Sequence, residues 1–245
     1  MLSLSRYVII GVITLLLGLL IVFPARVANH WFTPAGVAIS GIQGSIWRGH
    51  ALEGEIGGIY VRNLNWQMRP WALFTGELAY SVEADAVSGF INGNVALGIG
   101  GSAAIRDLTA SLSLQSMQSI VGMAGLGGTA NLQFARLVFK DGIPVAADGT
   151  LEIANLVAPL IDRSSVGGFR AEFFTQESGI IASVEDTDAV VELAGSLSVL
   201  PDRTYQFIAQ VAPKDSTPAN LREQMRFLGT PNERGQYEMR LEGQL

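Results

Sequence analysis

Apolar and polar residues alternate over short segments through most of this chain. In one segment, Leu78, Tyr80 and Val82 share a face, and Ser81 and Glu83 lie on the other. The same two-residue period recurs at 191–199, 205–211 and 237–242. A period of two is typical of strands with one buried and one wetter face, as in antiparallel sheets. The pattern therefore predicts a mainly β protein built on an antiparallel sheet.

Turn signals separate these segments and predict hairpins. Seven dipeptides end in glycine at such places: Ser88-Gly89, Asn92-Gly93, Asp141-Gly142, Asp148-Gly149, Gly167-Gly168, Ser178-Gly179 and Arg234-Gly235. Asn-Gly and Asp-Gly supply the positive φ that tight hairpins need. The chain has 28 glycines in 245 residues, which is above the usual share and indicates many turns. The spacing predicts a meandering sheet of many hairpins.

Two or three short helices are expected between the strands. The clearest one takes Thr217 as its N-cap and Pro218 as its first residue, and it ends before Gly229. A second helix is expected over Ser113–Gly125, and a single helical turn over Arg69–Gly76. Their apolar sides have helical spacing and are interpreted as core.

The N-terminal segment departs from this alternation. Tyr7–Phe23 is a run of seventeen residues without charge, and only Thr14 interrupts it as a polar residue. As a helix it would be roughly 25 Å long, just under the thickness of the hydrocarbon core of a bilayer. A helix on the surface of a globular core would show a polar stripe, which this run lacks. We expect either a transmembrane helix or a secretory signal.

The residues after the run favour an uncleaved anchor over a cleaved signal. Cleavage needs small residues spaced as Ala-x-Ala after a shorter apolar core, and Arg26 and Val27 stand where small residues are wanted. The amino terminus and Arg6 bias the N-terminus weakly toward the cytoplasm. We therefore expect a cytoplasmic tip and transmembrane anchor over residues 1–29 and a single periplasmic β-rich domain over residues 30–245.

Composition excludes some partners. The net charge is −6 and the pI is near 4.9, which argues against nucleic acid, because proteins that bind it carry a basic face. The chain has no cysteine, and it is long enough to bury a core without disulfides.

Groups that carry catalysis or bind metals are scarce. The two histidines, His30 and His50, lie near the anchor, and no cysteine is present to complete a zinc site. Glu185, Asp186 and Asp188 cluster as in a calcium site, but they lack its glycine and terminal glutamate, and we interpret them as a solvated turn. We identify no catalytic, cofactor-binding or metal residue, and we expect a protein that is not an enzyme and uses no cofactor.

All four tryptophans lie in the first third of the chain: Trp31, Trp47, Trp66 and Trp71. Trp31 follows the anchor closely enough to lie at the membrane interface, where indole rings prefer to be. For the other three, packing in the sheet core is favoured over an exposed patch that faces lipid or a partner.

Four stretches have a recognisable order. VAISGIQGSIWRGHA (Val37–Ala51) is followed by LNWQMRPWALFTGELAYSVEA (Leu64–Ala84), KDGIPVAADGTLEIANL (Lys140–Leu156) and a C-terminal LREQMRFLGTPNERGQYEMRLEGQL. This order resembles the protein N family of the bacterial type II secretion system over essentially the whole chain. The Gly-Ser-Ile-Trp-Arg-Gly and Trp-x-x-Arg-Pro-Trp-Ala-Leu segments are its most specific parts. Leu64–Leu78 is also similar to segments of AsmA-type periplasmic proteins.

The resemblance to the protein N family implies a non-enzymatic accessory protein of the cell inner membrane. Its periplasmic domain would support export of folded proteins across the outer membrane, with the membrane and other secretion components as partners. Unpaired edges of an open sheet would offer these partners a place for strand addition. The similarity to AsmA-type proteins implies a curved sheet, and it leaves an alternative: a periplasmic lipid-binding or lipid-transfer module with an apolar groove. A periplasmic hydrolase is a third class, which the scarcity of histidine disfavours.

Overall fold

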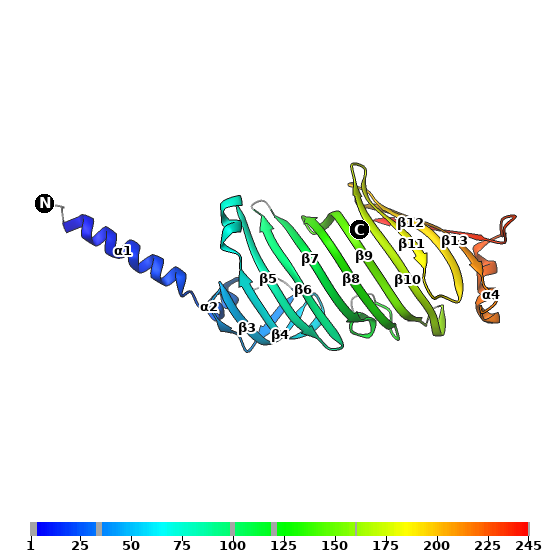
Figure 1. Cartoon of the computed structure of the whole chain (residues 1–245), viewed down its shortest axis with the longest axis horizontal. Helices are drawn as coiled ribbons and strands as arrows, with labels where there is room; N and C mark the ends of the chain where they lie inside the picture. The colour runs from blue at the N-terminus through cyan, green and yellow to red at the C-terminus, as the bar shows by residue number, and fades with distance from the viewer. Residues whose placement is uncertain (1–3, 33–35, 99–100, 119–121, 160, 245) are drawn as a thin grey trace.

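The structure is a computed structural model, and it describes residues 4–32, 36–98, 101–118, 122–159 and 161–244. Figure 1 shows one N-terminal helix that leads into the end of a long sheet, and a short helix at the opposite end of that sheet.

Two helices precede the sheet, α1 (Leu4–Ile21) and α2 (Ala25–Phe32). The strands are β1 (Val37–Ser40), β2 (Gln43–Gly44), β3 (Arg48–Ile56), β4 (Ile59–Met68), β5 (Glu77–Ala86), β6 (Gly89–Gly98), β7 (Ser102–Ser113), β8 (Gly127–Lys140), β9 (Ile143–Ala158), β10 (Asp162–Gln176), β11 (Gly179–Asp186), β12 (Val191–Val199), β13 (Thr204–Pro213) and β14 (Tyr237–Gln244). Short helices lie between strands: η1 (Pro70–Thr75), η2 (Leu114–Met117), α4 (Ala219–Met225) and η3 (Arg226–Leu228).

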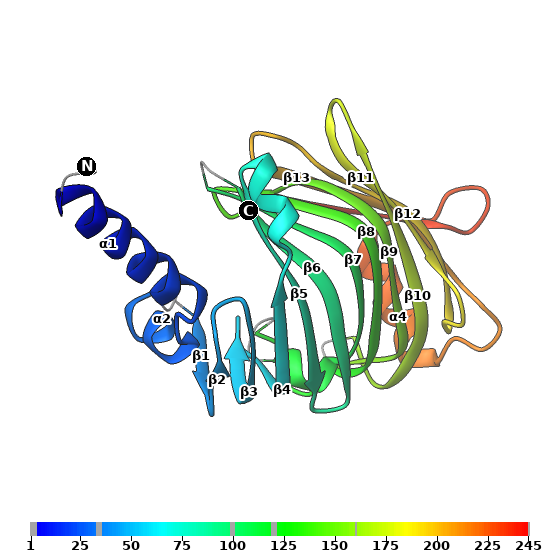
Figure 2. The ribbon, with the colours of Figure 1, turned by 60° about the vertical axis from the view of Figure 1, so that its left-hand side comes forward.

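The strands form one sheet in which neighbours along the chain are neighbours in space. The order runs β1-β3-β4-β5 and so on to β14, with β2 beside β3. Every pairing between these strands is antiparallel. The predicted mainly β fold and its meandering order are therefore confirmed. Figure 2 shows that the sheet is strongly curved.

Some of the predicted turns lie at turns and others lie inside strands. Asp141-Gly142 joins β8 to β9 with φ values of 52° and 78°, as a tight hairpin requires. Ser88-Gly89, Ser178-Gly179 and Arg234-Gly235 also lie at turns. Asn92-Gly93, Asp148-Gly149 and Gly167-Gly168 lie within β6, β9 and β10, so the hairpins predicted there were wrong.

The pairing register shifts at several places, and three of these shifts coincide with residues in the left-handed conformation. Asn63 in β4, Asp107 in β7 and Asn155 in β9 have φ values of 49°, 53° and 52°, and the pairing register shifts beside each of them. Asn and Asp adopt this left-handed conformation more readily than other side chains. A bulge adds a residue to one strand and increases its bend and twist. The three residues therefore help to account for the curvature of the sheet.

The clearest predicted helix is present with a different start. The N-cap of α4 is Pro218, whereas Thr217 was expected there. The Thr217 hydroxyl instead accepts a hydrogen bond from the Lys214 N–H (2.7 Å) and donates one to the Val190 carbonyl. The helix continues into η3 and ends before Gly229, as expected.

The other two predicted helices differ in outcome. The turn over Arg69–Gly76 is confirmed as η1, which ends at Gly76 in the left-handed conformation. Of the helix predicted over Ser113–Gly125, the structure describes a 3-10 turn at Leu114–Met117 followed by helical Gln118, and its further extent stays a prediction. The Ser113 hydroxyl caps this turn by accepting from the Gln115 N–H. Residues 119–121 lie outside the described residues.

Most of the N-terminal apolar run is helical, as α1. Within the part of the chain that the structure describes, no helix combines the length and the apolar character that crossing a bilayer requires. The transmembrane helix expected from Tyr7–Phe23 is therefore not found. The domain boundary expected between residues 29 and 30 falls within α2, and this division stays a prediction.

Candidate functional site

One face of the sheet is apolar across most of its width. Residues directly opposite one another in paired strands lie on the same face. From β5 to β9, one such row contains Tyr80, Val95, Ile105, Leu137 and Ala147. On β10 to β14, a second row contains Phe173, Ala182, Leu197, Phe207 and Leu241. We call the face that carries both rows the apolar face.

The middle of the apolar face packs through aromatic side chains. The rings of Phe134 and Phe173 have centroids 5.4 Å apart, although their strands are separated by β9. Gly149 is the β9 residue opposite both, and a Cβ there would come within 2.8 Å of the Phe134 ring. The glycine therefore leaves room for the Phe134 ring and for the Gln133 carbonyl, which a Cβ would approach to 2.3 Å.

At the N-terminal end, α2 covers the apolar face only in part. Ala25 is buried in a cluster with Ile42, Ala51 and Val61. Beside it lies a recess of about 410 Å³, lined by Ala25, Ala28, Asn29, Ile42, Ile46, Ile56, Trp66, Tyr80, Val82 and Val95. The Trp66 indole donates to the Ser45 carbonyl at 3.1 Å, and burial raises the pKa of Tyr80. The lining carries no charged side chain, so the recess suits an apolar group.

At the C-terminal end, α4 covers the apolar face more fully. Leu221 and Met225 are buried against β12, β13 and β14, in a cluster that includes Val191, Ala209 and Val211. The two apolar positions are four residues apart, which places them on one side of the helix. This end of the sheet therefore has a closed core.

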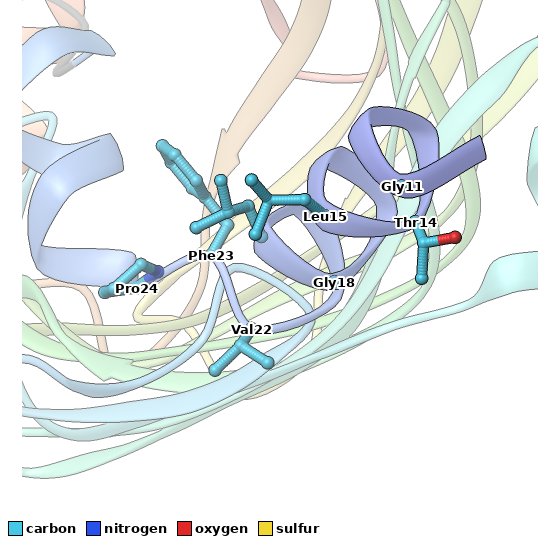
Figure 3. A pocket seen from close by; sticks show the side chains of 8 residues that line it. Gly11, Thr14, Leu15, Gly18, Val22, Phe23 and Pro24 are labelled. Atoms are coloured by element: carbon cyan, nitrogen blue, oxygen red, sulfur yellow. The ribbon is translucent and has the colours of Figure 1, made fainter. Parts of the chain in front are cut away.

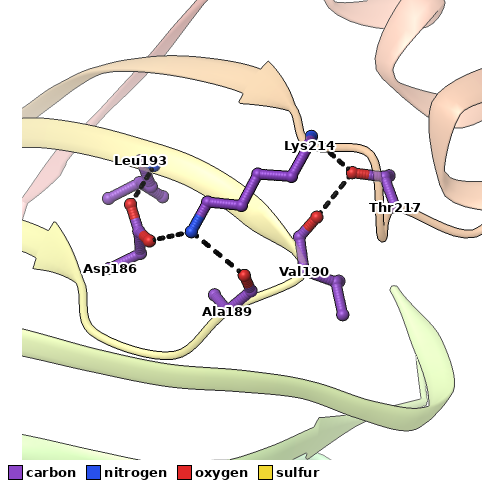
Figure 4. Close-up of polar contacts among 6 residues, drawn as sticks. All are labelled: Asp186, Ala189, Val190, Leu193, Lys214 and Thr217. Carbon is purple, nitrogen blue, oxygen red and sulfur yellow. Dashed lines mark hydrogen bonds and ion pairs between the residues drawn. The ribbon is translucent and has the colours of Figure 1, made fainter.

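A polar network holds α4 in place (Figure 4). The Lys214 ammonium donates to the Asp186 carboxylate and, at 3.1 Å, to the Ala189 carbonyl. The Leu193 N–H donates to the same carboxylate at 2.7 Å. Burial disfavours the Asp186 carboxylate, but the Lys214 and Leu193 donors outweigh burial and lower the pKa of Asp186. The network ties the turn after β11 to the loop that leads into α4.

The acidic cluster that contains Asp186 was expected to be a solvated turn. Glu185 and Asp188 are exposed as expected, although Glu185 lies in strand β11 and only Asp188 lies in the bend that follows. The interpretation was wrong for Asp186, whose side chain is only 13% exposed and pairs with Lys214. Sequence reasoning missed Lys214 and Thr217 as partners, because they lie 28 and 27 residues from Asp186 and Val190. No local spacing signals such a pair.

Within the described residues, no three His, Cys, Asp or Glu side chains come together to hold a metal ion. The two histidines are exposed on separate elements, His30 on α2 and His50 on β3. The expectations that the chain binds no metal or cofactor, and that it has no catalytic residue, stay predictions.

The opposite face of the sheet is polar and solvated. Arg106 pairs with Glu77 at 3.0 Å, and Arg170 pairs with Glu152. The hydrogen bond from Arg106 lowers the pKa of Glu77. Because these pairs are largely exposed, they contribute little to stability.

The sheet has two edges among the described strands. β1 ends the sheet on one side with four residues, and β14 ends it on the other with eight. β14 pairs with β13 from Tyr237 to Gln244, and Leu241 in it is 54% exposed. A long edge of this kind presents backbone groups that another strand can use.

The tryptophans divide between core and surface. Trp66 packs against the buried cluster of the N-terminal end, as expected, and Trp47 is half-buried. Trp71 is 79% exposed, so the core interpretation was wrong for it. Its position in η1, outside the alternating strands, was the available signal. The side chain of Trp31 lies outside the described residues.

An open hollow of about 910 Å³ lies along the N-terminal helix (Figure 3). Gly11, Thr14, Leu15, Gly18, Leu19, Val22, Phe23 and Pro24 line it, and all belong to α1 or to the turn after it. The Thr14 hydroxyl donates to the Ile10 carbonyl at 2.9 Å, within the helix. The hollow thus brings together no polar groups that point to a ligand.

Comparison with known proteins identifies a family. The family model described as type II secretion system (T2SS), protein N matches residues 35–240. A type II secretion system protein N from Vibrio cholerae is 30% identical over 91% of both chains. Proteins of the same name from Aeromonas hydrophila and Pectobacterium carotovorum are 24% and 22% identical, with coverage of 93% of both chains for the first and about 90% for the second. No solved structure matches the chain.

Proposed function

Because this chain belongs to the type II secretion system protein N family, we propose that it is a non-enzymatic accessory component of that system. In this proposal α1 holds the protein at the inner membrane, and the sheet lies in the periplasm. The protein supports export of folded proteins across the outer membrane by contact with other secretion components. The observation that carries the proposal is an open antiparallel sheet with a long edge strand, in a chain of this family.

The surface of α1 supports membrane attachment. Apolar side chains on all sides of the helix are about half exposed or more, among them Tyr7, Ile10, Val12, Leu15 and Leu19. A helix that is apolar on every side is stable only when protein or lipid covers it. The described contacts of α1 to the sheet do not cover these residues. Lipid is the covering that we propose.

A comparison of tethered and untethered protein tests the attachment. A strain without the endogenous protein would receive either the full chain or residues 31–245 behind a cleavable secretory signal. We expect export of secreted enzymes to fall sharply with the untethered form. Fractionation and immunoblotting would first establish that this form is soluble and present in the periplasm. Full export by it would contradict the tethering.

The edge strand β14 supports partner contact through strand addition. Its outer backbone groups have no strand partner among the described residues, and Tyr237 and Met239 on one face of the strand pack against the cluster that α4 completes. Main-chain hydrogen bonds would then provide affinity, and the side chains on the two faces would provide selectivity.

Site-specific crosslinking tests this contact. A photoreactive amino acid at Leu241 in β14 would be compared with one at Leu78, which is similarly exposed but lies in the interior strand β5. We expect crosslinks to a secretion component from position 241 only. Equal adducts at both positions, or none at position 241, would contradict contact at the edge.

The recess under α2 favours a second candidate function, that of a periplasmic lipid-binding or lipid-transfer module. Its uncharged lining and its continuity with the apolar face suit an acyl chain. Similarity to AsmA-type proteins stays a prediction. A phospholipid with a photoreactive acyl chain should label residues of the recess, and Ala28→Trp, which fills the space, should reduce the labelling. Labelling confined to α1 would argue against this candidate.

A further inference from the structure

The strongest unexplained surface is a pair of exposed aromatic rings on η1. Trp71 is 79% exposed and Phe74 is 83% exposed, and Leu73 between them is 47% exposed. Neither ring belongs to the buried apolar clusters found among the described residues. Side chains of this size are normally buried, and exposed groups of them mark interaction sites.

The turn that carries the rings is ordered by its own contacts. The Ala72 N–H donates to the Arg69 carbonyl, the Gly76 N–H to the Leu73 carbonyl, and the Thr75 hydroxyl to the Ala72 carbonyl, all at 2.8–3.1 Å. In a 3-10 turn, residues three apart are eclipsed. Trp71 and Phe74 therefore stack, with ring centroids 5.9 Å apart and planes 28° apart. The pair is a preformed apolar surface.

The same turn lies at the end of the sheet that receives α1. The Ile46 N–H donates to the Phe23 carbonyl at 3.1 Å, and the Met68 N–H donates to the Trp47 carbonyl at 2.7 Å. Met68 ends β4, and η1 begins two residues later at Pro70. In Figures 1 and 2, η1 (cyan) stands at the rim of the sheet on the side of α1, whereas α4 and η3 lie at the far end.

We propose that η1 docks onto the phospholipid surface of the membrane, with Trp71, Leu73 and Phe74 inserted at the level of the headgroups. This inference rests on the proposed membrane attachment of α1, and it adds a second contact that fixes how the sheet stands on the bilayer. The segment Pro70–Gly76 contains no charged residue, so nothing in it resists insertion. Tryptophan is the residue type enriched at this depth in membranes.

A depth measurement on the full-length chain tests the proposal. The chain has no cysteine, so Trp71→Cys or Phe74→Cys supplies a single site for a nitroxide label without other changes. The protein would be reconstituted into vesicles of phosphatidylethanolamine and phosphatidylglycerol. Collision of the label with oxygen, which concentrates in lipid, would be compared with collision with a water-soluble nickel chelate by electron paramagnetic resonance.

A matched control comes from the far end of the molecule. Phe227 in η3 is 88% exposed, and Phe227→Cys would carry the same label. We expect oxygen to dominate at positions 71 and 74 and the nickel chelate to dominate at position 227. Similar nickel accessibility at all three positions would overturn the proposal.

The readout separates this proposal from the attachment of α1. Flotation of the labelled protein with the vesicles reports attachment alone. Protein that floats while position 74 stays in water contradicts docking of η1 and leaves the anchor intact, whereas protein that does not float contradicts both. Protection of position 74 that needs added membrane proteins, and is absent with lipid alone, would assign the surface to a protein partner and also overturn the proposal.

Discussion

The two ends of the sheet are each covered by a short helix, and they are built differently. At the C-terminal end, α4 inserts Leu221 and Met225 into a closed cluster and is held by the Asp186–Lys214 network. At the N-terminal end, α2 contributes Ala25 to the core and leaves a recess of about 410 Å³ beside it. One end is therefore closed by a packed helix, whereas the other retains an apolar recess beside α2.

The largest loss of stability is expected at the C-terminal end, where α4 closes the core of the sheet. Leu221→Ala removes a buried side chain from between α4 and three strands, and large-to-small substitutions of this kind cost about 2–5 kcal/mol. Urea unfolding of the full chain, followed by circular dichroism, measures the loss. Leu228→Ala is the control, because Leu228 is 40% exposed and should lose much less. Equal losses of stability in the two variants would mean that Leu221 of α4 is not part of a buried core.

A glycine of β3, Gly49, tests how tightly the N-terminal end of the sheet is packed. A Cβ at Gly49 would lie 2.4 Å from the Trp66 ring and 2.6 Å from the Gln43 carbonyl. Gly49→Ala should therefore displace the recess wall and destabilise the chain by about 1–3 kcal/mol. Gly93→Ala, where the nearest atom is 3.4 Å away, should be nearly neutral in the same unfolding experiment. Retained stability in Gly49→Ala would show that this wall adjusts freely.

The Asp186–Lys214 pair should make the C-terminal end sensitive to acid. The folded-state pKa of Asp186 is below its usual value of 3.8, so the pair stabilises the chain above that value and loses this contribution as pH falls through the folded pKa. At neutral pH, Asp186→Asn should cost about 1–2 kcal/mol, since Lys214 is partly exposed. Unfolding at several pH values should show the difference from the wild type shrinking below about pH 4.

A second variant controls that experiment. Asp188→Asn changes a nearby exposed carboxylate and should leave stability and its pH dependence unchanged. A gap between wild type and Asp186→Asn that persists at low pH would contradict the ion pair as its cause.

The smallest loss of stability is expected for a substitution in the recess beside α2. Trp66→Phe removes the 3.1 Å hydrogen bond to the Ser45 carbonyl and should cost about 0.5–1 kcal/mol. Trp71→Phe is matched in chemistry but exposed, and it should leave the unfolding midpoint unchanged. A large loss in Trp71→Phe would indicate that η1 packs against the protein rather than facing outward.

The period-two pattern was enough to predict the sheet, because alternation of side chains is a property of each strand by itself. Asp141-Gly142 was predicted as a hairpin turn and forms one. Asp and Gly adopt its positive φ values more readily than most other residues. Asp148-Gly149 is the same kind of dipeptide and lies in β9, where Gly149 pairs with Phe134 and Phe173 of the two neighbouring strands.

The candidate sites were less predictable than the fold. Core packing was favoured for Trp71 and was wrong, although its place in a predicted helical turn outside the alternating strands was a signal of exposure. Leu114 and Met117, in the 3-10 turn that begins the helix predicted over Ser113–Gly125, pack against apolar residues of β8 and β9.

The class of the fold, the meandering order of its strands, the apolar N-terminal helix and the resemblance to a secretion family were all predictable from the amino-acid sequence. Each of these depends on local periodicity, residue type or motif order, which need no knowledge of distant contacts. The closure of one end of the sheet, the pairing of Asp186 with Lys214 and the exposure of Trp71 and Phe74 became visible in the folded chain. Those features depend on which strands and loops meet once the sheet curves, and residues that are far apart in the sequence show no local pattern that identifies such contacts.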